Sequence, residues 1–103
     1  ETPVNARHRD LITALAAEHR LPAIYGSREF VDAGGLISYG SSFPELYRRA
    51  AVYVDRILRG ARPADLPVEQ PARLELAVNL RAAAALGLTI PHSIIIRAEH
   101  VVR

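Results

Sequence analysis

The stretch that decides the fold is GGLISYGSSFPELYRRAAVYVDRILRG, residues 34–60, because it runs from a strand directly into a helix. Two glycines precede the apolar run 36–39, which predicts a strand, and the polar run 39–42 predicts a short loop after it. Open α/β sheets hold small ligands where a strand end meets a helix N-terminus, since free backbone N–H groups and the helix dipole point into the crevice. An ordinary tight turn is the alternative.

The helix that follows this loop has clear start and stop signals. Ser42-Phe43-Pro44-Glu45 has the pattern of a capping box, in which the Ser42 hydroxyl accepts from the Glu45 amide, and Gly60 is suited to the position just after the end. The helix is therefore expected over 43–59. It has one wide apolar side, formed by Leu46, Tyr47, Ala50, Ala51, Val54, Ile57 and Leu58.

Upstream of this stretch, the pattern predicts a helix over 6–19 with Asn5 as its N-cap, and then a buried strand over 21–25. Ser27 is suited to cap a short helix, residues 28–34, that leads into the strand 36–39. Downstream, alternation predicts a half-exposed strand over 74–78, and Asn79 is suited to cap a helix that Gly87 closes. The tail 88–103 fits either a short helix begun at Ser93 or a terminal strand.

This alternation of short strands with helices predicts an α/β fold with a parallel sheet. About three strands are readable, fewer than the roughly five or six of a typical sheet. Buried parallel strands need cover on both faces, so the sequence calls for more sheet than it contains. The expected fold is therefore a partial three-layer arrangement, and the chain is expected to be a fragment of a larger protein.

Composition excludes several classes of function. The 103 residues suffice for one domain at most, and the 13 basic residues, all arginine, are interleaved with 11 acids, which gives no basic face for nucleic acid. There is no cysteine, the four histidines lack metal-ligand spacing, and neither a nucleophile elbow nor a phosphate loop is present. We therefore expect no enzyme activity, no metal and no cofactor. Residues 1–10 lack the order of a signal peptide.

Three blocks, REFVDAGGLISYG, LYRRAAVYVDRILRGARPADLPVEQP and LAVNLRAAAALGLTIP, carry a family resemblance that covers nearly the whole chain. In order and spacing they resemble the C-terminal part of extracytoplasmic solute-binding proteins of ABC uptake systems, in the branch labelled tryptophan/tyrosine permease-like. Such proteins are about three times longer and have the two-lobed type I periplasmic-binding-protein fold. The resemblance thus implies a solute-binding component of an ABC transporter, periplasmic or otherwise extracytoplasmic, whose partners are a small solute and the permease subunits.

The resemblance also implies a layout for the chain. Residues 1–38 would be second-lobe elements, residues 39–61 would cross a hinge and supply a first-lobe helix, and residues 62–103 would return to the second lobe. The crossings are expected at 38–42 and at 62–68. The solute would be an amino-acid-like or aromatic compound, held between the lobes. As an alternative from another class, the chain is a small stand-alone α/β interaction or oligomerisation domain without a ligand.

Two loops are expected to face the ligand cleft. They are residues 25–29, at the end of the first predicted strand, and residues 39–42. The predicted ligand-binding residues are Tyr25, Ser27, Glu29, Tyr39, Gly40 and Ser41. Several residues of these two loops have a structural alternative: Ser42 is primarily a helix cap, the two tyrosines fit a core, and Arg28 with Glu29 fits an exposed first turn. Without cover for the apolar side of helix 43–59, the isolated fragment is expected to form a homo-oligomer.

Overall fold

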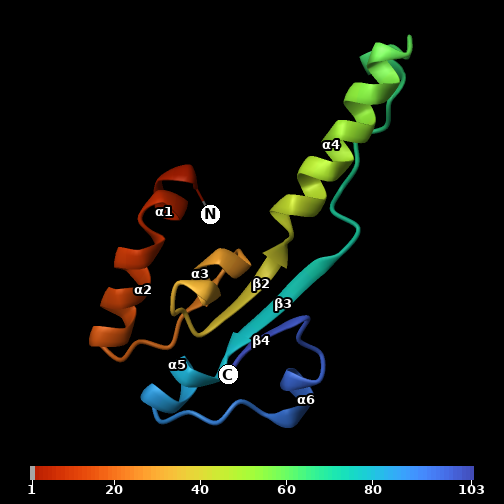
Figure 1. Ribbon diagram of the computed structural model, residues 1–103. Coiled ribbons are helices and arrows are strands. Elements are labelled where there is room, and N and C mark those ends of the chain that lie inside the picture. Colours follow the sequence, from red (N-terminus) through yellow and green to blue (C-terminus); the bar gives the residue numbers. More distant parts are fainter. Residues whose placement is uncertain (1) are drawn as a thin grey trace.

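The computed structural model describes residues 2–103 and has a mixed α/β fold (Figure 1). Its helices and strands follow one another along the chain as α1 (Pro3–Arg7), α2 (Arg9–Glu18), β1 (Ile24–Tyr25), α3 (Arg28–Asp32), β2 (Ile37–Ser41), α4 (Phe43–Leu58), η1 (Pro63–Asp65), β3 (Leu74–Asn79), α5 (Leu80–Ala85), α6 (His92–Ile95) and β4 (His100–Val102).

The four strands form one sheet in the order β1-β2-β3-β4. β1 and β2 run parallel, as do β3 and β4, so the predicted α/β class with a mostly parallel sheet is confirmed. The middle pair is antiparallel, and its register runs from Ile37 opposite Val78 to Ser41 opposite Leu74. This reversal arises because the chain leaves β2 into α4, turns at the far end of that helix and comes back beside it before entering β3 (Figure 1).

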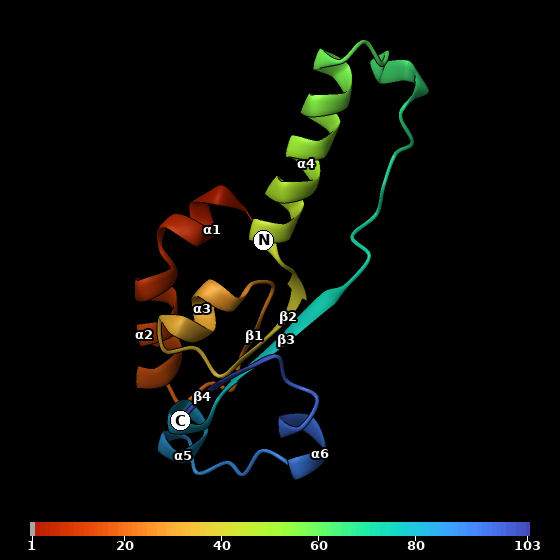
Figure 2. The same cartoon turned by 45° about the vertical axis from the view of Figure 1, so that its right-hand side comes forward.

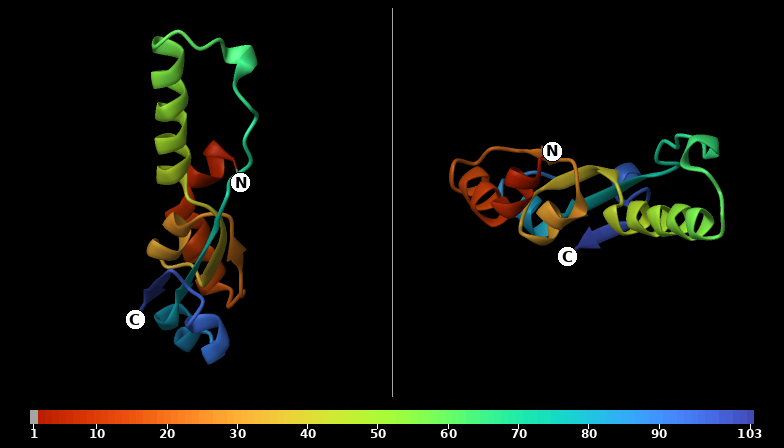
Figure 3. Two further views of the ribbon diagram at one scale, coloured as in Figure 1. Left: turned by 90° about the vertical axis from the view of Figure 1, so that its right-hand side faces the viewer. Right: turned by 90° about the horizontal axis from the view of Figure 1, so that it is seen from above.

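The core lies on both faces of the sheet, at the end of β3 that is remote from α4, and α3 covers one of these faces. Ala77 and Val78 of β3, which point to opposite faces, and Val31 of α3 are each 0% exposed. α2 lies on the outer side of α3, where the buried Thr13 hydroxyl donates to the Ala33 carbonyl oxygen at 3.1 Å. α6 lies on the opposite side of the sheet from α3 (Figure 3). Helices thus cover both faces of the sheet at this end.

Asn79 joins three elements at the centre of this core. Its side chain is buried. The side-chain Oδ1 accepts from the Ala82 amide at 3.0 Å, and the side-chain Nδ2 donates to the Val31 carbonyl at 3.3 Å. The first of these bonds is the N-cap of α5 that the sequence predicts. The second ties the end of β3 to α3, so one side chain sets the position of both helices against the sheet.

α4 projects from the rest of the molecule as an arm, and the connector, which we define as residues 61–73, returns beside it (Figure 2). None of the 16 residues of α4 is buried. The helix ends as predicted, with Gly60 at φ +109° and with the Ala61 amide bonded to the Arg56 carbonyl at 3.0 Å. The arm makes the molecule elongated, 56 × 31 × 17 Å, and its radius of gyration of 17.1 Å exceeds the roughly 13 Å of a compact domain of this size.

Several local predictions are wrong in detail. The predicted buried strand 21–25 shrinks to Ile24–Tyr25, and Ile24 is 75% exposed because β1 is an edge strand. The helix predicted over 6–19 is interrupted at His8, and Thr2 rather than Asn5 caps its first segment, through a 3.3 Å bond to the Asn5 amide. Local pattern does not reveal such breaks when both segments have good helix formers.

The predicted loop 39–42 is also wrong, because β2 continues to Ser41 through its pairing with β3. Ser42 does stand at the N-cap of α4, yet among the described residues its side chain makes no capping hydrogen bond. The capping box therefore marks the helix start without forming the expected contact. The tail contains both of the elements that its pattern left open, first the helix α6 and then the strand β4.

Candidate ligand-binding groove

A groove of about 420 Å³ opens where the N-terminal ends of α3 and α4 meet beside the sheet. Its walls are Arg28, Glu29, Asp32, Ser41, Ser42, Phe43, Pro44 and Glu75. Two of the predicted ligand-binding residues, Glu29 and Ser41, therefore lie on one groove although 12 positions separate them in the chain. The parallel pairing of β1 with β2 brings them together, since the segments that follow both strands emerge at the same end of the sheet.

The groove wall carries groups of opposite electrostatic preference. Glu29, Asp32 and Glu75 supply three carboxylates, against the single guanidinium of Arg28. The first residues of the 16-residue helix α4 and the half-buried Ser41 and Ser42 form the rest of the wall. A helix N-terminus favours negative groups, and hydroxyls donate as well as accept hydrogen bonds. The groove thus has groups that suit a cationic group and groups that suit an anionic one.

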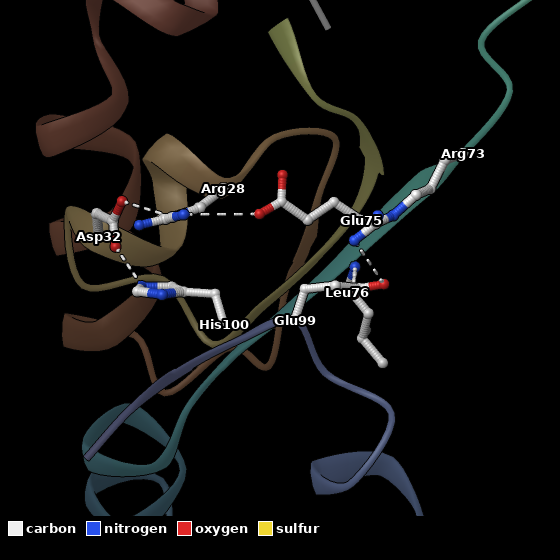
Figure 4. A network of polar contacts seen from close by, with 7 residues as sticks. All are labelled: Arg28, Asp32, Arg73, Glu75, Leu76, Glu99 and His100. Atoms are coloured by element: carbon white, nitrogen blue, oxygen red, sulfur yellow. Dashed lines mark hydrogen bonds and ion pairs between the residues drawn. The ribbon is translucent and has the colours of Figure 1, made fainter. Parts of the chain in front are cut away.

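Arg28 is fixed in place by the carboxylates beside it (Figure 4). Its Nε donates to Asp32 Oδ2 at 3.3 Å, and its Nη1 lies 3.7 Å from Glu75 Oε1. Asp32 Oδ1 in turn lies 2.8 Å from His100 Nε2, which links α3 to β4. Both partners of Arg28 are part of the groove wall, so the guanidinium links α3 to β3. Among the described residues of the wall, Glu29 is therefore the acid without an ion-pair partner.

The other predicted ligand-binding residues lie elsewhere. Tyr25 stacks on Phe30 with ring centroids 4.9 Å apart, and burial raises the pKa of its hydroxyl. Ser27 is 3% exposed at the N-cap position of α3. Gly40 is paired with Glu75 inside the sheet. Tyr39 is 57% exposed and lies on the sheet face opposite the buried Ser38, because side chains alternate along a strand.

Sequence reasoning missed four residues of the groove wall. The sequence pattern of Phe43 and Pro44 indicates only a helix start, although an N-terminal turn that faces a strand end exposes its first side chains to the crevice. Asp32 lies one turn after Arg28 on α3, and this spacing is a signal that the sequence does contain. Glu75 had no local signal, since it joins the groove through the register of β3 against β2.

A second cavity, of about 250 Å³, lies between α4 and the connector. Ser41 and Ser42 also contribute to its wall, so the two serines stand between both cavities. The Arg49 guanidinium holds the connector through Glu69, with Nη2 to Oε1 at 2.5 Å and Nε to Oε2 at 3.1 Å. The hydrogen bond from Arg49 lowers the pKa of Glu69, and the Tyr53 hydroxyl donates to the Pro67 carbonyl. These contacts make the connector part of the arm.

A third cavity, of about 460 Å³, lies between α2, the end of α3 and α5, and Tyr25 forms part of its wall. Its lining is mostly alanine, glycine and leucine. Asp32 lines both this cavity and the groove, whereas Tyr25 lines only this cavity and Glu29 only the groove. Within residues 2–103 there is no cluster of three or more metal-ligating side chains, and no helix of that range is both long and apolar enough to cross a membrane.

Comparison with known proteins gives this geometry a context. A protein family described as "ABC transporter substrate binding protein" matches residues 4–102 of this chain. No curated protein sequence matches the chain. Among solved structures, an ABC domain from Streptococcus pneumoniae in complex with L-Trp matches 97% of the chain, with 26% identity and a TM-score of 0.89.

Two further solved structures are similar. A conserved domain protein from Vibrio cholerae O1 biovar El Tor matches 94% of the chain, with 28% identity and a TM-score of 0.86. A ligand-free, open substrate-binding protein from Clostridium difficile, 23% identical over 95% of the chain with a TM-score of 0.60, shares the fold. This chain spans about a third of the length of these structures, 33%, 34% and 32% in the order Vibrio, Streptococcus, Clostridium.

Proposed function

The chain belongs to the ABC transporter substrate binding protein family, and from that membership we propose that it is part of a two-lobed protein that binds a small amino-acid-like or aromatic solute. The observation that carries this proposal is the match of 97% of the chain, at a TM-score of 0.89, to a domain in complex with L-Trp. The protein would act outside the cytoplasm and deliver its solute to the membrane subunits of an ABC permease. No bond of the solute would be made or broken.

In the proposed layout, residues 1–38 and 62–103 form most of one lobe, and residues 39–61 cross a hinge and place α4 in the other. Two observations support this division. β2 passes into α4 at Ser42 without an intervening loop, and no side chain of α4 is buried by the remainder of the chain. The return crossing is better drawn at 70–74 than at 62–68, because Glu69 and Pro67 are bonded to α4.

The polarity of the groove supports a zwitterionic solute. We propose that the solute carboxylate lies at the N-terminus of α4 beside Ser41 and that its ammonium group faces Glu29. Phe43, 42% exposed on the groove wall, is placed to contact an apolar or aromatic side chain of the solute. The first lobe of the complete protein would close the other side of the groove, and the solute would stabilise the closed state through contacts with both lobes.

The experiment has two parts. The mass of the intact gene product, measured from its source cells, is expected to be about three times the 11.3 kDa of this chain. Calorimetric titration of that product with L-tryptophan is expected to give saturable binding. Tryptamine, which lacks the carboxylate, and indole-3-propionate, which lacks the amine, are expected to bind at least about tenfold more weakly, since each leaves some groups of the groove wall unpaired.

Two results would contradict the proposal. A native product of 11.3 kDa that binds neither L-tryptophan nor any of the other standard amino acids would favour the stand-alone interaction domain. Equal affinity for L-tryptophan, tryptamine and indole-3-propionate would leave a solute-binding role intact and would overturn the zwitterion geometry, because the charged groups would then contribute nothing to recognition.

A further inference from the structure

The single guanidinium of the groove wall engages two of the wall's three acids. Arg28 Nε donates to Asp32 Oδ2 at 3.3 Å, and Arg28 Nη1 lies 3.7 Å from Glu75 Oε1. Both acids therefore have a cation beside them, whereas Glu29 has no ion-pair partner among the described residues of the wall. The wall thus offers a solute one acid that is free and two that are occupied.

Asp32 is engaged through both of its carboxylate oxygens. While Oδ2 accepts from Arg28, Oδ1 lies 2.8 Å from His100 Nε2 on β4 (Figure 4). The His100 side chain is 26% exposed, so this contact is partly shielded from solvent. A solute ammonium group would bind Asp32 only by displacing one of these two partners.

Glu75 is placed beside Arg28 by the sheet. It stands opposite Gly40 in the antiparallel ladder of β2 with β3, and its side chain is 21% exposed. Within residues 2–103, Arg28 is the one cation at ion-pair distance from it, and Figure 4 shows the Arg28 side chain lying between Asp32 and Glu75. Because solvent screens a half-buried pair less than an exposed one, the guanidinium has a strong influence on the charge that Glu75 presents to the groove.

The position of Arg28 matters for any solute that carries a second cationic group. Such a group, entering the groove beside Glu29, would meet a guanidinium in place of a free carboxylate, and like charges close together repel. A solute with one ammonium group avoids this repulsion, because Glu29 alone receives that group through a charge-assisted hydrogen bond.

From this arrangement we propose that Arg28 is the residue that determines which solute charge the groove accepts. It occupies Asp32 and Glu75, leaves Glu29 for the solute, and so selects solutes with one ammonium group over solutes with two. The inference rests on the solute-binding role proposed above and adds to it a rule for the charge of the solute. A purely structural role of Arg28, as a link between α3 and β3, would not produce this selectivity.

The test uses two probes of the same size. L-Norleucine and L-ornithine have side chains with the same number of heavy atoms, and ornithine ends in an ammonium group where norleucine ends in a methyl group. Each competes with L-tryptophan for the intact gene product in a calorimetric titration, and the measured quantity is the ratio of the ornithine Kd to the norleucine Kd. The parent protein is expected to give a ratio of about ten or more.

Arg28→Gln is expected to lower this ratio by about tenfold or more, because the change removes the like charge and frees both acids. Arg28→Lys keeps the positive charge, so its ratio is expected to stay within about threefold of the parent value. Circular dichroism and thermal unfolding of each variant check that the protein is folded.

Glu75→Gln tests the same arrangement with the opposite sign. It removes one of the two acids that Arg28 engages, so the wall becomes less negative and the ratio is expected to rise by about threefold or more. This variant keeps the proposal testable if Arg28→Gln does not fold. A loss of packing alone would not move the ratio in opposite directions in the two variants.

Arg62→Gln is the matched control. Arg62 pairs with Asp65, three residues along the connector, at 2.9 Å and lies outside the groove wall. The change removes one positive charge and one ion pair without altering the groove, so the ratio should equal that of the parent.

The outcomes separate this inference from the proposed function. If the parent protein binds L-tryptophan and norleucine, a ratio near one would overturn the charge rule and leave the solute-binding role intact. The same holds if folded Arg28→Gln and Glu75→Gln proteins both keep the parent ratio. A parent protein that binds neither L-tryptophan nor either probe would overturn the solute-binding role and this inference with it.

Discussion

A side chain at Gly40 would overlap the carbonyl oxygen of Gly26, since a Cβ built at Gly40 stands 1.9 Å from that oxygen. Real Cβ contacts are never this short, and the obstacle is backbone, which cannot rotate away. The close approach occurs just beyond the short parallel pair of β1 with β2, so glycine at position 40 lets the segment 25–29 lie against β2. A ligand role for Gly40 stays a prediction, while its structural role follows from this contact.

Gly40→Ala is therefore expected to reduce the free energy of unfolding by about 1–3 kcal/mol and to displace the 25–29 segment. Urea unfolding monitored by circular dichroism measures the loss. Gly87→Ala serves as the control, because Gly87 has φ +72° with open space around it, so the change there introduces backbone strain without a clash. A loss no larger at Gly40 than at Gly87 would show that the contact with Gly26 relaxes easily.

Asn79→Ala is expected to reduce the free energy of unfolding by about 2–3 kcal/mol. The change removes the cap of α5 and leaves the buried Val31 carbonyl without its donor. Asn5→Ala is the matched control, since Asn5 lies inside α1 and its backbone amide, not its side chain, makes the capping bond. We expect that control to change stability by less than about 0.5 kcal/mol. Similar midpoints for the two variants in urea would contradict the central position of Asn79.

Glu99 makes the folded state sensitive to acid. Its Oε2 accepts from the Leu76 amide at 2.8 Å, and this bond, with a smaller effect of Arg73, lowers the pKa of Glu99 below its ordinary value of 4.5. A lowered folded-state pKa means that the stabilisation is present above pH 4.5 and is lost as the pH falls through the folded-state pKa. Because Glu99 is largely exposed, the effect is expected to be about 1 kcal/mol or less.

The measurement is the difference in unfolding free energy between the parent chain and Glu99→Gln. That difference should be present at pH 7 and should shrink toward zero as the pH falls below 4.5 and through the lowered pKa of Glu99. Asp65→Asn, which removes an exposed acid near the tip of the connector, provides the comparison for general loss of negative charge. A difference between parent and Glu99→Gln that does not vary with pH would contradict the assigned pKa direction.

Ser41 and Ser42 offer a matched pair for the proposed solute site. In the intact protein, Ser41→Ala is expected to weaken L-tryptophan binding by about 1 kcal/mol with little change in stability, since it would remove one hydrogen bond to the solute. Ser42→Ala, expected from the sequence to cost stability through a lost cap, should now leave stability within about 0.5 kcal/mol, because no capping bond is made within the described residues. Calorimetry and thermal unfolding separate the two effects, and unchanged affinity for Ser41→Ala would remove that hydroxyl from the site.

The fold was predictable where the signals are local. The limits of α4, the cap at Asn79 and the stop at Gly60 each depend on a few adjacent residues, and each is confirmed. The antiparallel pairing of β2 with β3 was not predictable, because it depends on how the chain returns from α4 over more than ten residues that carry no strand pattern. The extension of β2 to Ser41 has the same origin, since pairing with Leu74 overrides a polar sequence that otherwise favours a loop.

Some residues of the groove wall were predictable from local sequence signals, and others were not. Glu29 and Ser41 follow strand ends, and the rule that such ends meet at one edge of a parallel sheet is enough to place them together. Glu75 comes from an antiparallel neighbour, to which that rule does not apply. Tyr25 follows the rule in sequence yet packs on Phe30, because an aromatic ring beside a small core gains more from burial than from solvent.

The pairing of Ser41 with Leu74 has a mechanical consequence. Ser41 ends β2 and Leu74 begins β3, and they form the last pair of the ladder on the side of the arm. The helix α4 and the connector therefore both leave the sheet at one point. Bonds from the connector to Arg49 and Tyr53 join the two segments into one stiff body beyond it. We therefore expect the arm to move against the sheet mainly by pivoting about this point. Over the roughly 24 Å length of α4, a pivot of about 10° would carry the tip through about 4 Å, so small changes beside the two serines are magnified at Gly60.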